Sequence, residues 1–370
     1  MILLNDFRRQ WEDTGREILD AVTAVGESGW YLVGEQLWQF EAALAQAWGL
    51  SYAAGVASGL DAIEISLRLL GCRPGDRVLT TPLSAFATTL AIVKLGAVPV
   101  FVDTDEAGLI DLDQCRRALD GSGIRFLVPV HLYGHSLDLH KLRELRDGFG
   151  CAIVEDCAQS ILASFDGVPA GSVGQLAATS FYPTKNLGAM GDSGAVLTNS
   201  PESLTAIKAL RDYGQSSKYK HDVVGYNSRM EELHAAILHR AFLPRLKGWT
   251  DRRREIAARY LAGIDHPGIR LMHAPRGSRS VWHLFPILVA PERKRAFMQY
   301  LRSRDITTGE HYPIPIPEQK ALEGVAYEVL QPYERAAGIA AAEVSLPIHP
   351  YLSDAEVDQV IAACNEWEAD

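Results

Sequence analysis

The sequence has few of the features that mark several common classes of protein. A formal net charge of −10 leaves no excess of positive charge for nucleic acid or an anionic membrane surface. No apolar run is long enough to span a bilayer. No Gly-x-Gly-x-x-Gly motif follows a first predicted strand, which argues against a nicotinamide dehydrogenase. The five cysteines include no Cys-x-x-Cys pair, which argues against a disulfide framework or a zinc site; they are Cys72, Cys115, Cys151, Cys157 and Cys364.

What the sequence does have is the composition of a large globular protein. Its 370 residues, 47% hydrophobic and 22% charged, are enough for more than one domain. The first residues, Met-Ile-Leu-Leu followed by Asp6, lack the long apolar core of a signal peptide. Scattered cysteines suit a reducing compartment. We therefore expect a cytoplasmic protein.

Strand-like apolar runs alternate with amphipathic helical patterns through the first two thirds of the chain. This alternation predicts βαβ units and a mostly parallel sheet in an α/β fold. Strands are expected at residues 51–56, 77–81, 98–102, 125–130, 151–155, 176–182 and 195–198, and helices at residues 6–25, 35–48, 63–70, 112–119, 137–147 and 203–211. After an N-terminal arm and large domain, residues 1–244, we expect a smaller α+β domain over residues 245–370.

Lys185 follows one of these apolar runs and precedes a glycine-rich loop, so that little side-chain bulk would separate it from a planar ligand. A desolvated lysine amine is a nucleophile that forms Schiff bases with carbonyl compounds. Asp156 ends another apolar run, at the edge of the sheet where open α/β folds bind ligands. Pyridoxal phosphate needs both groups, since a carboxylate keeps its ring nitrogen protonated.

Three motifs in order resemble the DegT/DnrJ/EryC1/StrS family of pyridoxal-phosphate-dependent sugar aminotransferases. They are Glu155-Asp156-Cys157-Ala158-Gln159, Phe181-Tyr182-Pro183-Thr184-Lys185-Asn186-Leu187-Gly188 and Gly225-Tyr226-Asn227-Ser228-Arg229. The likeness extends over nearly the whole chain. It implies an aspartate-aminotransferase-like fold of type I, with a seven-stranded, mostly parallel sheet in the large domain.

The resemblance also implies roles at the cofactor. Lys185 would form the Schiff base, Asp156 would pair with the ring nitrogen, and the cofactor would alternate between pyridoxal and pyridoxamine 5′-phosphate. Its other expected contacts are Gln159 near the ring and its phenolic oxygen, Ser180 and the backbone of Gly59 and Leu60 at the phosphate, and Phe86 stacked on the ring. Asn227 would reach the phosphate of the neighbouring subunit, so we expect a homodimer with shared active sites.

Several of these positions also have an ordinary structural interpretation. Phe86 is as well suited to a hydrophobic core as to a ring stack. Ser58 and Leu60 depart from the family's usual Asn-Gly-Thr-Asp, so only backbone contacts carry over at Leu60. Ser193 stands where a second glycine or an alanine is common. His131 and His135 lack a carboxylate-rich partner set and are interpreted as loop structure near the cofactor rather than a metal site.

For the substrates, the resemblance implies glutamate as amino donor and a nucleotide-linked keto sugar as acceptor. The pattern Pro-x-Lys-Asn-Leu-Gly-x-x-Gly-Asp-x-Gly-Ala around Lys185 resembles members that act on 3-keto sugars, which favours a dTDP-3-keto-6-deoxyhexose. Candidate substrate contacts are Tyr182, Lys218, Tyr219, Arg229, His311 and Tyr312. A 4-keto or UDP-linked sugar and a non-catalytic, cofactor-binding regulatory protein stay open. A dehydratase is disfavoured, because dehydratases of the family replace the lysine by histidine.

Overall fold

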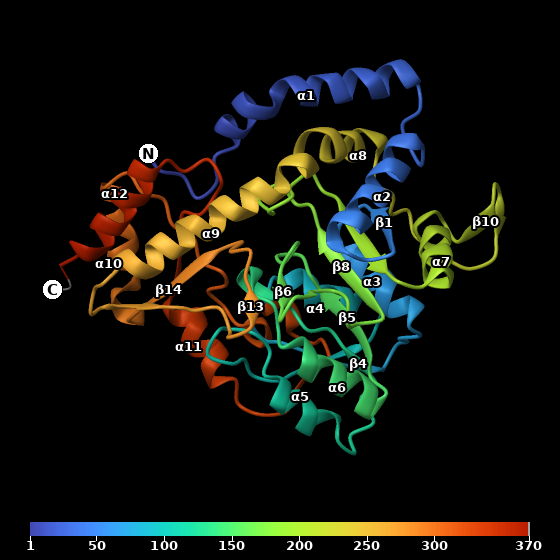
Figure 1. Cartoon of the computed structure of the whole chain (residues 1–370). Coiled ribbons are helices and arrows are strands. Elements are labelled where there is room, and N and C mark those ends of the chain that lie inside the picture. Colours follow the sequence, from blue (N-terminus) through green and yellow to red (C-terminus); the bar gives the residue numbers. More distant parts are fainter. Residues whose placement is uncertain (369–370) are drawn as a thin grey trace.

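The computed structural model describes residues 1–368 as a mixed α/β structure (Figure 1). Its helices are α1 (Phe7–Ser28), α2 (Glu35–Trp48), α3 (Gly59–Leu69), α4 (Phe86–Lys94), α5 (Leu112–Leu119), α6 (Leu139–Phe149), α7 (Pro201–Arg211), α8 (Glu232–Ile237), α9 (Leu246–Gly263), α10 (Pro291–Ser303), α11 (Glu334–Ala342) and α12 (Asp354–Asn365). Its strands are β1 (Tyr52–Val56), β2 (Arg77–Thr80), β3 (Val98–Phe101), β4 (Phe126–Leu127), β5 (Ala152–Asp156), β6 (Ser164–Phe165), β7 (Val168–Pro169), β8 (Leu176–Ser180), β9 (Gly194–Thr198), β10 (Gln215–Ser217), β11 (Lys220–His221), β12 (Ile269–Leu271), β13 (Ser278–Arg279), β14 (Phe285–Val289), β15 (Glu328–Val329) and β16 (Glu343–Leu346).

The main sheet has eight strands in the order β1-β9-β8-β5-β4-β2-β3-β15. Strands β8, β5, β4, β2, β3 and β15 pair in parallel, whereas β9 is antiparallel to both β1 and β8. The mostly parallel α/β prediction is therefore confirmed. Seven strands were predicted, and the eighth was missed because β15 is two residues long and comes from the C-terminal part of the chain.

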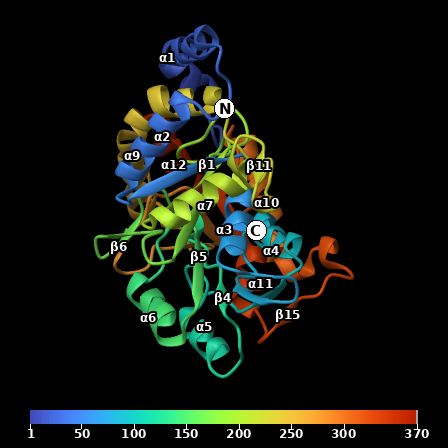
Figure 2. The same ribbon diagram turned by 90° about the vertical axis from the view of Figure 1, so that its right-hand side faces the viewer.

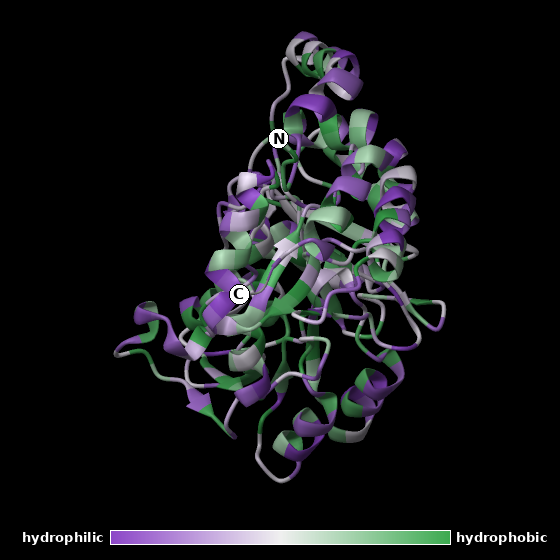
Figure 3. Cartoon of the chain, turned by 90° about the vertical axis from the view of Figure 1, so that its left-hand side faces the viewer, coloured by the Kyte–Doolittle hydropathy of each residue, from purple (hydrophilic) through white to green (hydrophobic). Residues whose placement is uncertain are grey.

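Both faces of this sheet are buried, because successive side chains of a strand point to opposite faces. Ala53, Ala177 and Ala195 pack into a cluster with α1, α2 and α8, whereas their neighbours Ala54, Ala178 and Val196 pack against α3 and α7. Figure 3 shows the central strands coloured as mostly hydrophobic and the outer helices as mixed. Small side chains on the strands let the covering helices come close to the backbone.

The first helix lies at one end of the molecule, opposite α5 and α6 (Figure 2), where Ile18, Ala21 and Val25 pack against α2 and α8. Asp6 caps its start by accepting hydrogen bonds from the amides of Arg8 and Arg9. It was expected to end at residue 25 but continues to Ser28, since a helix tolerates Gly26, and it stops at Gly29 in the left-handed conformation (φ 63°). Ahead of it, Ile2 pairs with Ile306.

The C-terminal part has its own three-stranded antiparallel sheet, in the order β12-β14-β16. Its core includes Tyr260, Phe285, Phe297 and Val357, from α9, β14, α10 and α12. The predicted domain boundary near residue 245 lies just before α9. Among residues 1–368, none of the helices combines the length and apolar character that crossing a lipid bilayer requires.

Candidate active site

A cavity of about 480 Å³ opens at the ends of β5 and β8, beside the start of α3. Asp156, Ser180 and Lys185 line it together with His311 and Tyr312. The sequence places these residues far apart, and the parallel sheet brings the ends of their strands to one edge. Gly59, Leu60 and Tyr182 line it as well, and Gln159 lies behind Tyr312, so nine residues predicted to form one site face or border one cavity.

Lys185 lies in the loop between β8 and β9. Its backbone amide donates to the carbonyl oxygen of Tyr182 (2.8 Å), and this hydrogen bond closes a tight turn. The side chain of Lys185 lines the cavity. The lysine is half-buried. Loss of solvation lowers the pKa of Lys185 from 10.5 to about 8, against the opposing pull of the Asp156 carboxylate. A larger share of this amine is therefore unprotonated near neutral pH than of a surface lysine.

Asp156 is the last residue of β5, and its side chain is 3% exposed. One carboxylate oxygen accepts from the hydroxyl of Thr88 (2.8 Å) and the other from the amide of Ala158 (3.0 Å). Burial raises the pKa of Asp156, while these two hydrogen bonds and Lys185 oppose the rise. Such a carboxylate gains from a positively charged partner in the cavity.

The start of α3 faces the cavity opposite Ser180. Ser58 caps the helix, its hydroxyl accepting from the amide of Asp61 (3.1 Å). At Gly59 a Cβ atom would lie 2.6 Å from the Cβ of Ser180, so the two segments approach closely only because residue 59 has no side chain. The free amides of an eleven-residue helix and a serine hydroxyl form an arrangement suited to a phosphate.

Gln159 lies behind the cavity and links two tyrosines around it by hydrogen bonds. Its carbonyl oxygen accepts from the amide of Tyr133 (2.7 Å), and its amide nitrogen donates to the hydroxyl of Tyr312 (3.2 Å). The Tyr133 hydroxyl in turn donates to the carbonyl oxygen of His311 (2.7 Å). Burial raises the pKa of the Tyr312 hydroxyl well above its usual range, so it stays protonated at neutral pH.

Two histidines line the cavity on the side of the C-terminal part. His283 was not predicted, because in the sequence it is an isolated histidine outside any motif. The Nδ1 atom of His283 lies 3.1 Å from the amide oxygen of Asn186. Burial and Lys185 lower the pKa of both rings, that of His311 to about 4. Both are therefore neutral at pH 7. Thr88 and Ala85 are further cavity residues that the sequence did not single out.

The expected stacking of Phe86 on the cofactor ring stays a prediction. Phe86 packs against Phe101, Ile316 and Leu322, and its neighbours Ala85 and Ala87 line the cavity instead. Phe86 is the first residue of α4, so the helical turn directs adjacent side chains to different sides. Its contacts with the small cluster of Phe101, Ile316 and Leu322 are those of its interpretation as a packing residue.

Four other predicted residues do not line the cavity of their own chain. Lys218 and Tyr219 lie in the β10-β11 hairpin, which projects from the body in Figure 1, and Tyr219 is 82% exposed. Arg229 pairs with Asp212 (2.9 Å) and donates to the side chain of the exposed Asn227 (2.7 Å). Tyr182 and Leu60, in contrast, do line the cavity.

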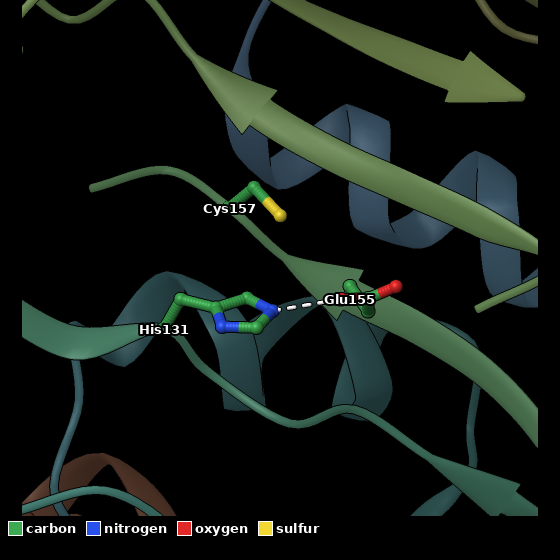
Figure 4. A group of neighbouring side chains, drawn as sticks. All are labelled: His131, Glu155 and Cys157. Carbon is green, nitrogen blue, oxygen red and sulfur yellow. Dashed lines mark hydrogen bonds and ion pairs between the residues drawn. The ribbon is translucent and has the colours of Figure 1, made fainter. Parts of the chain in front are cut away.

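A possible metal site, formed by His131, Glu155 and Cys157, is a hydrogen-bonded structural cluster instead (Figure 4). The amide of Leu137 donates to Nδ1 of His131 (3.1 Å), which leaves Nε2 to carry the proton and donate to Glu155 (2.8 Å). Glu155 also accepts from three backbone amides, those of Gly171, Val173 and Gly174 (2.6–2.8 Å). The lone pairs of His131 and Glu155 that a cation would need are already in use.

Comparison with known proteins decides the class. Residues 12–365 match the DegT/DnrJ/EryC1/StrS aminotransferase family. The chain belongs to this family. It is 40% identical over 368 residues to dTDP-3-amino-3,4,6-trideoxy-alpha-D-glucose transaminase of Streptomyces venezuelae, an alignment that covers 98% of this chain and 95% of that protein. The protein is thus an enzyme of the aminotransferase class.

Solved structures of the aminotransferase family share the fold. The crystal structure of DesV from S. venezuelae, in complex with a ketimine intermediate, superposes with a TM-score of 0.93 at 40% identity and covers 99% of this chain and 98% of its own. The structure of NtdA from Bacillus subtilis, with bound cofactor PMP, has a TM-score of 0.86 at 29% identity and covers 94% of this chain and 80% of its own. The predicted aminotransferase fold is therefore confirmed.

Proposed function

We propose that this aminotransferase uses pyridoxal 5′-phosphate to move the amino group of glutamate to a nucleotide-linked keto sugar, giving a 3-amino sugar. The favoured acceptor is a dTDP-3-keto-6-deoxyhexose. The observation that carries the proposal is the pairing of one desolvated lysine with one buried carboxylate across a single cavity. The transaminase from S. venezuelae, named for a dTDP-3-amino sugar, supports the choice of acceptor.

The residues of the cavity suit the cofactor. When bound, pyridoxal phosphate supplies an aldehyde for the lysine amine and an electron-accepting ring. Asp156, held by Thr88 and Ala158, would accept a hydrogen bond from the ring nitrogen and keep it protonated. Ser180 and the amides of Gly59 and Leu60 would bind the phosphate, without a side-chain hydroxyl at Leu60.

Lys185 would then act twice in each half of the reaction. Its Nζ holds the cofactor, and once displaced by the amino donor it takes a proton from the α-carbon of that donor and returns it on the cofactor side. A base works best when its pKa lies near the working pH, and the pKa of Lys185, lowered to about 8, meets this condition. Gln159 and Tyr312 would stay in place as donors beside the ring.

A nucleotide-linked sugar carries a negatively charged pyrophosphate. Among residues 1–368, however, Lys185 is the sole lysine or arginine that lines the cavity. A second copy of the chain would supply the missing charge. Lys218, Tyr219 and Arg229 would contact substrate, and Asn227 the cofactor phosphate, across a homodimer interface. The exposed Trp11, Trp30 and Trp38 of the N-terminal arm and α2 provide apolar surface for such an interface.

The test is incubation of the purified protein with glutamate and a panel of dTDP- and UDP-linked 3-keto and 4-keto sugars, followed by identification of the carbon that gains nitrogen. The proposal predicts amination at C3 of a dTDP-linked acceptor. Amination at C4, or of a UDP sugar only, would move the assignment to the alternative acceptors. A protein that binds the cofactor but does not lose its visible absorbance on addition of glutamate would be a regulatory relative, not a transaminase.

A further inference from the structure

A buried carboxylate lies directly behind His311, outside the set of residues that the cofactor requires. Glu343 is the first residue of β16 and is 1% exposed. One of its oxygens accepts from the backbone amide of His311 (2.6 Å), and the other accepts from the hydroxyl of Ser345 (2.5 Å). Ser345 lies 2.9 Å from Nδ1 of His311. The three side chains form a continuous hydrogen-bonded row that ends at the cavity.

The backbone makes this row rigid. Gly309 and Ser345 exchange two hydrogen bonds between their main chains (2.8 and 3.1 Å), which ties the segment before His311 to β16. The second nitrogen of the ring, Nε2, is separated from Nδ1 by one carbon, makes no hydrogen bond within residues 1–368, and is the one left for a ligand in the cavity that His311 lines. What His311 offers to a ligand therefore depends on which nitrogen carries its single proton.

The charge of Glu343 decides which group donates and which accepts in each hydrogen bond of the row. An ionised carboxylate only accepts hydrogen bonds, so the hydroxyl of Ser345 donates to it and is left to accept from Nδ1–H of His311. Nε2 then has a free lone pair. If Glu343 is protonated, it donates to Ser345, whose hydroxyl donates to Nδ1, and the proton of the ring moves to Nε2 by exchange with solvent.

The surroundings place this change within the working range of an enzyme. Burial raises the pKa of Glu343 to about 7, opposed by its bonds to Ser345 and His311 and by Lys294 of α10. Lys294 is itself paired with Glu310 (2.7 Å) and donates to the carbonyl oxygen of Ala340 at the end of α11 (3.2 Å). Glu310 pushes the pKa upward. The other titratable neighbours, Tyr133, Tyr312 and the neutral ring of His311, stay uncharged near pH 7.

We infer that Glu343 and Ser345 are positioning residues that hold His311 in the Nδ1–H tautomer, so that Nε2 accepts a hydrogen bond from a hydroxyl of the sugar substrate. This inference rests on the proposed function, because it assigns a role within the same cavity. It adds two residues that touch neither cofactor nor substrate. It also gives the site a hydrogen-bond acceptor beside the apolar side chains of Leu284 and Ile348.

The decisive variant is Glu343→Gln, which has the shape of the protonated acid. Its amide oxygen accepts from the amide of His311, and its NH₂ group donates to Ser345, which reverses the row at every pH. Loss of one hydrogen bond to the sugar lowers kcat/KM for the keto sugar by about tenfold. We expect that loss at pH 8 and little or none at pH 6, where wild-type Glu343 is protonated as well.

Two further variants separate this role from a structural one. Glu310→Gln removes a neighbouring negative charge that raises the pKa of Glu343, so it should move the pH dependence of kcat/KM to lower pH and leave kcat/KM at pH 8 unchanged. Ser345→Ala interrupts the row, so adding Glu343→Gln to it should cause no further loss. A ratio of wild-type to Glu343→Gln activity that stays constant from pH 6 to 8 would overturn the inference.

A spectroscopic measurement decides the tautomer without any activity assay. In ¹⁵N-histidine-labelled protein, the His311 signal, assigned by its loss in His311→Asn, should show a protonated Nδ1 at pH 8 and a protonated Nε2 at pH 6. Wild-type protein alone suffices if Glu343→Gln does not fold. A ring that carries its proton on Nε2 at pH 8 refutes the inference. A protein that aminates no keto sugar refutes the proposed function instead, and the ring spectrum still reports on the row.

Discussion

Replacing Lys185 by methionine should stabilise the cofactor-free protein at neutral pH while abolishing transamination. The folded protein holds the Lys185 ammonium in surroundings that lower its pKa from 10.5 to about 8. Between these values the unfolded chain binds the proton more readily than the folded one. The cost to stability is therefore complete below pH 8 and disappears as the pH rises through 10.5.

The size of the effect follows from that difference. A pKa lowered from 10.5 to about 8 corresponds to a cost of at most about 3 kcal/mol at pH 7. Water in the cavity and the nearby Asp156 reduce the part that methionine recovers, so we expect a gain of about 1–3 kcal/mol at pH 7 and less than about 1 kcal/mol at pH 10. Methionine has a similar length to lysine and no ionisable group. Its apolar contribution to the free energy of unfolding is therefore the same at both pH values.

The assay is urea unfolding of both cofactor-free proteins at pH 7 and pH 10, at one protein concentration. Lys247→Met is a matched control, since the Lys247 side chain is 86% exposed and its pair with Asp251 lies at the surface. It should change the free energy of unfolding by less than about 0.5 kcal/mol. A gain for Lys185→Met that is equal at the two pH values, or a loss at pH 7, would refute the claim that Lys185 is held in a desolvated state.

Three further substitutions test the remaining parts of the site. Asp156→Asn should lower kcat roughly a hundredfold, because the ring nitrogen loses its charged partner, and an unchanged kcat in steady-state assays would count against that pairing. Gly59→Ala should weaken cofactor binding in spectroscopic titrations, since its Cβ would lie 2.6 Å from that of Ser180; Gly248→Ala, which meets nothing within 4 Å, should not. Tyr219→Ala should raise KM for the nucleotide sugar several-fold with kcat nearly unchanged, because a side chain that contacts the substrate equally in the ground state and the transition state affects binding alone. A lowered kcat with unchanged KM would contradict a substrate-binding role of the hairpin.

Much of the fold could be predicted from the sequence because the pattern of apolar residues is strong where elements are long. The helix over residues 35–48 has the predicted limits, ending at Gly49 in the left-handed conformation. The strands before Asp156 and Lys185 were also predicted, and the parallel sheet then requires their ends to meet. The short strands β6, β7, β13 and β15 could not be predicted, since two residues carry no periodicity.

The residues of the site divide in a similar way. Lys185, Asp156 and Gln159 stand in motifs with fixed spacing, so sequence reasoning could place them near one another. For Phe86 the sequence left a ring stack and a core position open, because the exact start of a helix decides which of several adjacent side chains faces the cavity. Glu343 had no signal at all: a glutamate at the start of a short strand becomes notable only once β16 pairs with the segment before His311.

The central claim is that the amine of residue 185 holds the cofactor. Borohydride reduction of cofactor-saturated protein, followed by proteolysis and peptide mass mapping, tests it most directly, because reduction makes that bond permanent. We expect one pyridoxyl adduct for each chain, located on Lys185 and missing in Lys185→Met. An adduct on another lysine, or no adduct on the saturated protein, would contradict the account.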